Sequence, residues 1–425
     1  MNSRSTLCRL LLAFFAANAC ALSVATAQTA APAAKLVDPL ATMLGQLNLE
    51  KYKTTIKSLT QFGDRRQGTE RNRRALDWIE AQLKSYGCTH VERLQYSFTE
   101  PGPRLSSGPG GGGGLGGPAG SGGSTLFGDR AYTGVNGNPL LQADVKLREL
   151  NTEQTPIGTS MRENVYCTKV GTTHPEEMYI VSAHMDGIGF GEAANDNGSG
   201  TALVMELARI FSAPGVSTER SIRFALWNNE ESGLNGARAY VDQRKNLQGI
   251  ESPKGSGKYP EPKWLGVIQH DMMLWDHGMP IPKLDAAGKP VVDAKGQAVY
   301  VSPPEQRREA DVNIEFQSNS VLSDASAKLA WVLHAANTKY ATHYPAAVGP
   351  HMTNTDSITF MDLAPSISLR ENERGQQIGA GWNPNWHQPS DMFSTYSDKD
   401  FMLGLNAAQT TLAGVAQLSG ASIKK

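Results

Sequence analysis

The sequence lacks the features of a nucleic-acid-binding or membrane-spanning protein. Its 40 Lys and Arg residues nearly balance 41 Asp and Glu residues, so the formal net charge is −1. Arg4 and Arg9 contribute the charges of the first 27 residues, and the remaining chain therefore carries −3 with no basic stripe. We expect no nucleic-acid partner. Beyond residue 27 no apolar run is long enough to span a bilayer, so no membrane anchor is expected either.

Cysteine is scarce, with four residues in 425. Cys8 and Cys20 lie in the N-terminal segment, where Asn18 makes the residues before Cys20 a poor lipidation signal. The chain has no Cys-x-x-Cys pair, which excludes a zinc cluster of that type. Cys88 and Cys167 remain. In an oxidising compartment they can form a disulfide bond or stay as two buried thiols, and the sequence leaves both possibilities open.

The first 27 residues have the composition of a secretory signal peptide. Two arginines precede the apolar segment Leu10–Ala17, and the small residues Ala25–Ala27 form a cleavage signal. We therefore expect the chain to be exported, to the periplasm or out of the cell. Residues 28–425 are then expected to form the functional domain.

Short apolar runs alternate with amphipathic stretches along the rest of the chain, a pattern that predicts an α/β fold. Buried strands are expected at Met178–Ala183, Ile222–Trp227, Trp264–Gln269 and Ser366–Leu369. Two further strands, at Val91–Phe98 and Asn164–Val170, are expected to pair with each other. Helical spacing is found at 49–62, 70–86, 199–211, 234–243, 323–340 and 399–418. We predict a single domain with a mixed, mostly parallel central sheet and helices on both faces.

Two segments do not fit this alternation. Residues 101–127 form a Gly-rich stretch that includes the unbroken run Gly110–Gly114, which has the composition of a flexible linker. We interpret this stretch as an insertion within the domain. Residues 276–312 are turn-rich and polar, and we expect them to form an excursion near the mouth of the site.

Residues of metal-binding type follow two of the predicted strands. His184 and Asp186 follow the first strand, and the pair Glu230-Glu231 follows the next one along the chain. Each residue alone is most often a solvated or hydrogen-bonded side chain. However, open α/β sheets place their sites at the carboxyl ends of strands. Imidazole nitrogen and carboxylate oxygen are also ligands that zinc accepts, so the pattern indicates a metal site.

The sequence resembles the co-catalytic di-zinc aminopeptidases in five blocks, which occur in the same order as in that family. That superfamily also holds glutamate carboxypeptidases, glutaminyl cyclases and the catalytically dead transferrin receptor. The resemblance extends from Leu49 to Leu418, apart from the two segments described above. The blocks are His184-Met185-Asp186, Asp196-Asn197-Gly198-Ser199-Gly200, Glu230-Glu231-Ser232-Gly233-Leu234, Asp271-Met272, and His387 with Asp391.

The resemblance implies a complete set of ligands for two zinc ions. His184 and Asp271 hold one ion by this resemblance, Glu231 and His387 hold the other, and Asp196 bridges both. The chemistry agrees, because a carboxylate has two oxygens and can link two cations ~3.5 to 4 Å apart. Positions left open on the metals are available for water and substrate.

The same resemblance implies roles for three acids that are not ligands. Asp186 corresponds to the acid that orients the imidazole of His184. For Asp391 two interpretations stay open, a similar service behind His387 and a loop residue exposed to solvent. Glu230 is the candidate general base, which accepts a proton from the metal-activated water. By this mechanism the metal hydroxide attacks the carbonyl, and no covalent enzyme intermediate forms.

The sequence departs from the family pattern in places. Thr355–Ser357 stands where the family often has Ser-Asp-His, and no Tyr is found for oxyanion support. His270, which precedes a proposed ligand, is interpreted as a hydrogen-bonded strand histidine and not as a ligand. His277 and His351 are likewise interpreted as hydrogen-bonded histidines and not as ligands. Asn197 corresponds to the position of the family's non-proline cis peptide bond.

We therefore expect a zinc exopeptidase with two zinc ions, and most simply an aminopeptidase. Its substrate would be a peptide or amino-acid amide with a free N-terminus. A carboxypeptidase remains open because it uses the same ligands. A single-zinc glutaminyl cyclase is disfavoured by the intact Asp196–Gly200 motif, and a receptor-like binding module by the five filled ligand positions.

Overall fold

The computed structural model describes residues 39–100, 135–276, 283–294, 299, 312–350, 355–371 and 383–423. Every described element belongs to one unit, Asp38–Lys425. The predicted signal peptide, the Gly-rich insertion, most of the excursion, His277 and His351 lie outside the described residues. Among the helices that the structure describes, none is both long and apolar enough to cross a membrane.

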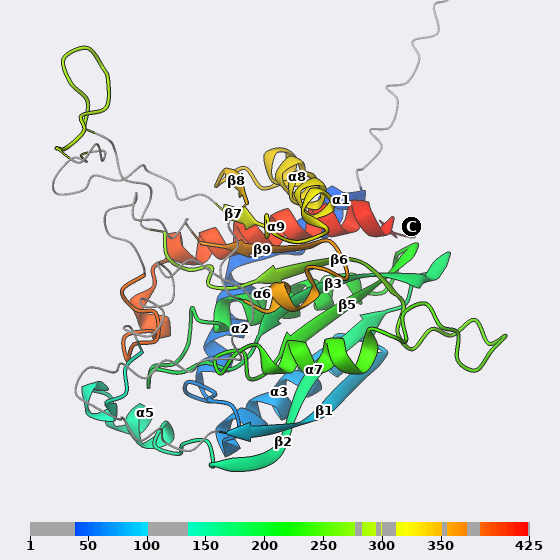
Figure 1. Ribbon diagram of the computed structural model, residues 1–425, viewed down its shortest axis with the longest axis horizontal. Helices are drawn as coiled ribbons and strands as arrows, with labels where there is room; N and C mark the ends of the chain where they lie inside the picture. The colour runs from blue at the N-terminus through cyan, green and yellow to red at the C-terminus, as the bar shows by residue number, and fades with distance from the viewer. Residues whose placement is uncertain are drawn as a thin grey trace, which may run out of the picture. The chain divides into compact units, whose positions relative to one another are not determined.

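An eight-stranded sheet with the order β1-β2-β5-β3-β6-β9-β7-β8 is the centre of the fold (Figure 1). The four central strands β5, β3, β6 and β9 are parallel to one another. β2 pairs antiparallel with β1 and β5, whereas β7 pairs antiparallel with β9 and parallel with β8. The predicted mixed, mostly parallel sheet is confirmed. The strands are β1 (His90–Glu100), β2 (Gly158–Lys169), β3 (His174–His184), β5 (Arg220–Trp227), β6 (Lys263–His270), β7 (Val312–Glu315), β8 (Ala346–Gly349) and β9 (Ser366–Arg370). A separate pair joins β4 (Val216–Ser217) to β10 (Ser422–Ile423).

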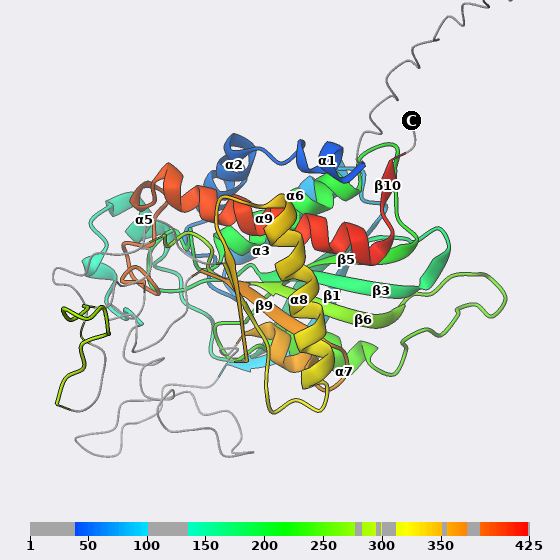
Figure 2. The same ribbon diagram turned by 90° about the horizontal axis from the view of Figure 1, so that it is seen from above.

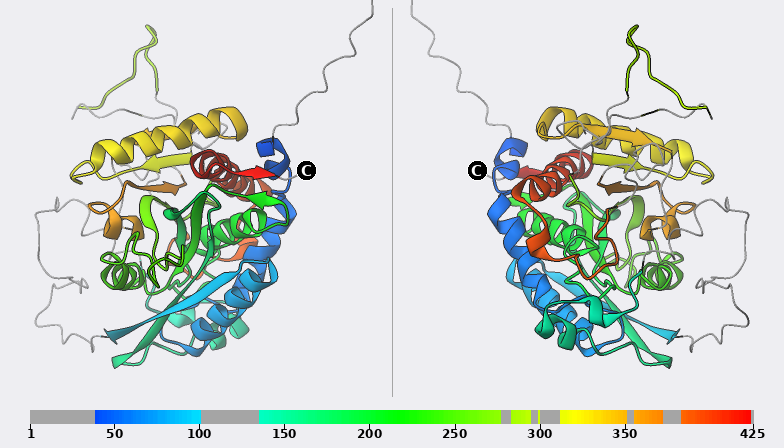
Figure 3. Two further views of the ribbon diagram at one scale, coloured as in Figure 1. Left: turned by 90° about the vertical axis from the view of Figure 1, so that its right-hand side faces the viewer. Right: turned by 90° about the vertical axis from the view of Figure 1, so that its left-hand side faces the viewer.

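Helices cover both faces of the sheet, with α2 and α6 on one side and α7 on the other (Figure 3). On the first side α9 packs against α6 and α8 (Figure 2). The α-helices are α1 (Pro39–Leu44), α2 (Leu49–Thr60), α3 (Glu70–Ser85), α5 (Val145–Leu150), α6 (Gly198–Phe211), α7 (Asn235–Arg244), α8 (Ser323–Tyr340) and α9 (Asp398–Ser419). Short 3₁₀ helices are η1 (Pro139–Leu141), η2 (Asp356–Phe360) and η4 (Phe393–Thr395).

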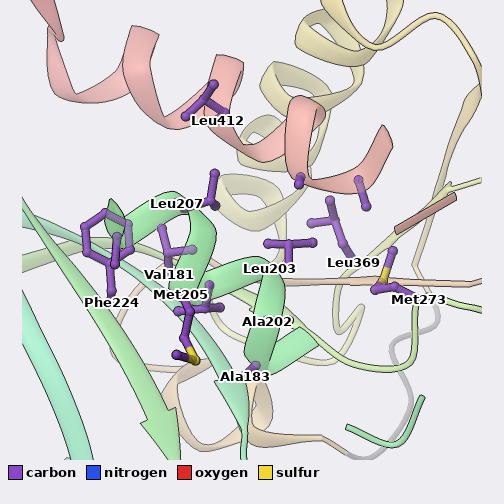
Figure 4. Close-up of a cluster of buried hydrophobic side chains, with 14 of the residues drawn as sticks. Val181, Ala183, Ala202, Leu203, Met205, Leu207, Phe224, Met273, Leu369 and Leu412 are labelled. Atoms are coloured by element: carbon purple, nitrogen blue, oxygen red, sulfur yellow. The ribbon is translucent and has the colours of Figure 1, made fainter. Parts of the chain in front are cut away.

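The central strands are apolar on both faces because each face meets helices. In β3, Val181 and Ala183 belong to the core cluster beneath α6 and α9, whereas Met178 and Ile180 belong to the cluster beneath α7. This alternation follows the two-residue period of a strand. Figure 4 shows the first cluster, in which Leu203 and the side chains around it fill the space between sheet and helices. The near-continuous apolar runs in the sequence therefore reflect strands that are buried on both sides.

A disulfide bond joins Cys88, after α3, to Cys167 in β2, with a Cα–Cα distance of 6.1 Å. The predicted pairing of β1 with β2 brings the two residues together, because Val91 lies opposite Cys167 in the register. The sequence left the choice between a bridge and two thiols open, and the structure contains the bridge.

Removing this bridge is expected to destabilise the protein without affecting the site. Replacing both Cys88 and Cys167 by Ala should lower the free energy of unfolding by roughly 2 to 4 kcal/mol, because the bond closes a long loop in the unfolded chain. Urea denaturation of the two proteins measures the difference. Thiol labelling provides the control: protein without residues 1–27 should show no reactive thiol when denatured and two after reduction. Two reactive thiols before reduction would contradict the bridge.

Candidate metal centre

The carboxyl ends of the parallel strands bring the candidate ligands to one edge of the sheet. His184 is the last residue of β3, and Asp271 follows β6 directly. Glu230 and Glu231 follow β5 after a short turn. The loop before α6 supplies Asp196, and the loop before α9 supplies His387. The five predicted ligands therefore come from five separate segments.

The structure places Asp196 between the two histidines. Oδ1 of Asp196 lies 3.3 Å from Nε2 of His184, and Oδ2 lies 3.0 Å from Nε2 of His387. On the first side Oδ1 of Asp271 is 3.4 Å from Nε2 of His184. On the second side Oε2 of Glu231 is 2.8 Å from Nε2 of His387. All five predicted ligands are thus brought together, in two groups that share Asp196.

Glu230 lies at the same centre. Ligand-type atoms of His184, Glu230 and Asp271 lie within 4.8 Å of one another, and so do those of His184, Asp196 and Glu231. Glu231 also contacts His387. The described ion pairs include none between Glu230 and His387. The neighbouring glutamates therefore face the centre differently, with Glu231 beside the second histidine and Glu230 beside the first.

The charges of these residues fit divalent cations. Burial raises the pKa of Glu230 well above its ordinary value, and it raises the pKa of Glu231 to about 7 despite the nearby His387. Burial lowers the pKa of His387, but Glu231 and Asp196 overcome this effect and raise it to about 10. Burial thus disfavours the ionised form of both glutamates, and bound cations would offset this cost.

Two buried oxygens are also open to a metal. Oε1 of Glu231 and Oδ1 of Asp271 make no hydrogen bond within the part of the chain that the structure describes. Buried polar atoms normally have a partner, and an exception calls for an explanation such as an ion. Carboxylate oxygens and imidazole nitrogens together form a donor set that suits zinc.

The sequence Asp196–Gly200 folds into the start of α6. The peptide bond between Asp196 and Asn197 is cis, as the family resemblance implied. Oδ1 of Asn197 accepts a hydrogen bond from the backbone N–H of Gly200 and thereby caps the helix. A Cβ atom at Gly200 would lie 2.4 Å from that oxygen and 2.6 Å from the carbonyl of His270, so this position needs glycine. The cap fixes the loop that carries Asp196.

Asp391 is buried and does not contact the imidazole of His387 in the described contacts, so both interpretations of this residue are wrong. The carboxylate of Asp391 instead accepts hydrogen bonds from the backbone N–H groups of Asn195 (2.9 Å) and Asp196 (3.0 Å). Nδ1 of His387 has no hydrogen-bond partner within the described residues, and its ring stacks on Trp386 with a centroid distance of 3.9 Å. Asp391 therefore holds the loop of the bridging carboxylate, and stacking contributes to the orientation of the histidine.

Asp186 orients the site through two different groups. Nδ1 of His184 forms a hydrogen bond of 3.0 Å with the backbone carbonyl of Asp186, which fixes the ring, while the carboxylate lies 3.8 Å away. That carboxylate accepts hydrogen bonds from the backbone N–H groups of Glu230 (3.1 Å) and Glu231 (3.4 Å). Its main contact is thus with the glutamate turn and not with the imidazole.

Glu371 is a buried acid that the sequence analysis missed. Oε2 of Glu371 accepts hydrogen bonds from Nδ2 of Asn195 (2.9 Å) and from the backbone N–H of Trp275 (2.7 Å). Its other oxygen accepts one from Nδ2 of Asn383 at 3.3 Å. These contacts join the three loops that carry Asp196, Asp271 and His387.

Arg370 and Asp356 were also missed as parts of the centre. Nη2 of Arg370 donates to Oδ2 of Asp271 at 2.8 Å. Asp356 is fully buried and accepts a hydrogen bond from Nε2 of Gln269, and burial raises its pKa to about 8. Arg370 and Glu371 could have been found by the strand-end rule that indicated His184 and Glu230, because they directly follow the predicted apolar strand Ser366–Leu369.

His270 is a structural histidine, as interpreted from the sequence. Its Nδ1 lies 3.1 Å from the backbone carbonyl of Ser182, and its Nε2 lies 2.8 Å from Oγ1 of Thr411 in α9. Burial lowers its pKa to about 4, so the ring is neutral at pH 7. One nitrogen thus bonds within the sheet and the other bonds to α9, so the ring connects the helix to the sheet.

The fold is that of solved aminopeptidases and of a glutaminyl cyclase. The aminopeptidase from Aneurinibacillus sp. strain AM-1 is 17% identical with a TM-score of 0.55, over 91% of this chain and 97% of that chain. A zinc aminopeptidase from Bacillus subtilis is 16% identical with a TM-score of 0.55, over 89% and 96%. The Porphyromonas gingivalis glutaminyl cyclase is 16% identical with a TM-score of 0.51, over 88% and 99%. At these identities the likeness establishes the fold alone.

The family follows from the sequence. Peptidase family M28 matches residues 164–409, which is more than half of the chain and includes all five candidate ligands. The chain belongs to peptidase family M28.

Individual relatives share shorter stretches with this chain. The probable lipoprotein aminopeptidase LpqL of Mycobacterium tuberculosis is 36% identical over 126 residues, which is 29% of this chain and 23% of that protein. Aminopeptidase YwaD of Bacillus subtilis is 38% identical over 103 residues (24% and 20%), and carboxypeptidase Q of Xenopus laevis is 34% identical over 89 residues (21% and 19%). The matched part spans about a fifth of the length of these relatives.

Proposed function

We propose that the protein is an exported exopeptidase with two zinc ions, and specifically an aminopeptidase. One observation carries this proposal: the two oxygens of Asp196 face two different histidines, each of which has a further carboxylate beside it. A site for a single cation would not require two histidines that each have a second carboxylate beside them. Two cations that share a carboxylate account for this arrangement.

The proposed ligands follow from this arrangement. His184 and Asp271 hold one zinc ion, Glu231 and His387 hold the other, and Asp196 bridges them. When bound, the two ions would polarise the substrate carbonyl, bind the substrate's free amine and lower the pKa of water. They would also lower the pKa of Glu230, which burial raises, so that its carboxylate is ionised at neutral pH.

The residues of the chain then provide positioning and proton transfer. The carboxylate of Glu230 accepts a proton from the attacking water and passes it to the nitrogen of the departing amine. Asp186 fixes the Glu230 backbone through the hydrogen bond to its N–H group. Asp391 and Glu371 hold the loops from both sides of the bridging acid. The fold shared with solved aminopeptidases, the membership of peptidase family M28 and the relatives named aminopeptidases support this function.

Export is part of the proposal. It is supported by the signal-like composition of residues 1–27 and by the disulfide bond, which persists in oxidising compartments.

A panel of peptides tests the reaction and its direction. We expect the purified protein to remove N-terminal residues from peptides with a free amine and to leave peptides with an acetylated N-terminus uncut. Mass spectrometry of the products shows which end is shortened. Shortening from the C-terminus would indicate the carboxypeptidase, the alternative that the match to carboxypeptidase Q favours. Cyclisation of N-terminal glutamine without cleavage would indicate a glutaminyl cyclase.

A further inference from the structure

Arg370 lies beside a proposed zinc ligand because of strand register. β9 pairs in parallel with β6, and Leu369 lies opposite His270. The following residues, Arg370 and Asp271, are therefore neighbours at the carboxyl ends of the two strands. Their side chains are 2% and 5% exposed, and Nη2 of Arg370 is 2.8 Å from Oδ2 of Asp271. The ion pair is thus buried within the candidate metal centre.

The contact divides the two oxygens of Asp271 between two functions. Oδ2 is held by Arg370, whereas Oδ1 points towards His184, 3.4 Å from Nε2, and makes no hydrogen bond with the described residues. Asp196 differs, because each of its oxygens faces a histidine. In this geometry Asp271 has one oxygen left for a metal and Asp196 has two.

Arg65, another buried arginine near the centre, does not share this contact. The guanidinium of Arg65 donates to the backbone carbonyls of Met185, Glu192 and Ala193. Among the ion pairs that the structure describes, Arg370 is the arginine that contacts one of the five proposed ligands. A guanidinium is planar and permanently charged, so it can fix the orientation of a carboxylate as well as share its charge.

We propose that Arg370 is a positioning residue that restricts Asp271 to one oxygen as a zinc ligand and thereby sets the affinity and coordination number of that zinc site. This inference rests on the proposed function. With Oδ2 held, Asp271 donates one atom, which keeps the number of ligands low as zinc prefers. With Oδ2 released, both oxygens can bind, and the carboxylate loses the partner that orients it.

Zinc content and cobalt spectra of Arg370→Gln test this inference. Dialysis against graded chelator followed by elemental mass spectrometry should show two zinc equivalents in the original protein. In the variant one equivalent should bind ~10- to 100-fold more weakly and the other should be unchanged, since partners of metal ligands contribute about this much. In the cobalt-substituted proteins, the visible absorption of the variant should be weaker because its coordination number is higher. Two zinc ions of original affinity with an unchanged cobalt spectrum would overturn the inference.

Two further variants separate this effect from a general loss of structure. Arg370→Lys keeps the charge but not the planar guanidinium, so it should retain more zinc affinity than Arg370→Gln while its cobalt spectrum remains altered. If Arg370→Gln does not fold, Arg370→Lys tests the inference in its place, and an unchanged cobalt spectrum of Arg370→Lys would then refute the inference.

Arg223→Gln is the control, because it removes another buried arginine, which pairs with Glu261 at 2.5 Å. It should lower stability but keep both zinc ions. Loss of one zinc ion from this control as well would also overturn the inference, whereas an original protein without zinc would overturn the proposed function itself.

Discussion

Replacing Glu230 with Gln is expected to lower kcat by about 10² to 10⁴ while both zinc ions stay bound, because a positioned general base contributes roughly this factor. Gln has the same shape but cannot accept the proton. The hydrogen bond from the backbone N–H of Glu230 to Asp186 does not depend on the side chain, so the turn should keep its position. The change in KM should be much smaller than the change in kcat. Steady-state kinetics together with metal analysis measure both quantities.

Glu231→Gln is the matched control, because the same substitution is made at the neighbouring residue. Its carboxylate lies 2.8 Å from Nε2 of His387, so the neutral amide should weaken the zinc ion at that side of the centre. The two variants should therefore differ in metal content as well as in rate. If Glu230→Gln turned over normally, or if it lost metal where Glu231→Gln did not, the assignment of base and ligand would have to be reversed.

Asp196→Asn should affect both zinc ions at once. The amide has one oxygen and no charge, so it cannot bridge, and both sites lose a ligand. We expect each affinity to fall by more than about 100-fold, which is the upper end of the loss seen when only a partner of a ligand is removed. Hydrolysis should fall with the metal content. The melting temperature in the presence of zinc should also fall, because bound ligand stabilises only the folded state.

Two histidine variants complete this comparison. His184→Ala and His387→Ala should each lose about one zinc equivalent, since each histidine lies on one side of the bridge. If Asp196→Asn instead kept one tightly bound zinc ion, as the histidine variants should, Asp196 would be a ligand of one zinc ion only.

The central strands could be predicted from the sequence because their apolar runs are buried on both faces, and the long helices because their apolar residues recur at helical spacing. Met178–Ala183 and Ile222–Trp227 lie in β3 and β5, and α8 has the predicted bounds. β7 and β8 were not predicted. β7 contains the polar residues Asn313 and Glu315, and β8 is four residues of small or β-branched type, Ala346–Gly349, at the edge of the sheet. Such short segments become strands through pairing with neighbours and not through their own pattern.

The residue pattern predicted the part of the candidate site that lies at strand ends, whereas the loop residues Asp196 and His387 were predicted through the family resemblance. His184, Glu230, Glu231 and Asp271 each follow an apolar strand, and parallel strands bring their carboxyl ends to one edge. The contacts of the loops could not be read in this way. Asp391 bonds to Asn195 and Asp196, which lie 196 and 195 positions earlier in the chain. Only the folded loops show that its partners are these backbone N–H groups and not His387.

Titration of metal-free protein with zinc tests the central claim most directly. The protein is stripped with a chelator, zinc is added back in known amounts, and bound zinc, hydrolysis and melting temperature are followed together. We expect two tightly bound equivalents, no hydrolysis in the stripped protein, recovery of hydrolysis as zinc is restored, and a rise in melting temperature with binding, since the ligands come from five separate segments. Full hydrolytic activity after complete removal of metal, or saturation at fewer than two equivalents, would contradict the di-zinc centre.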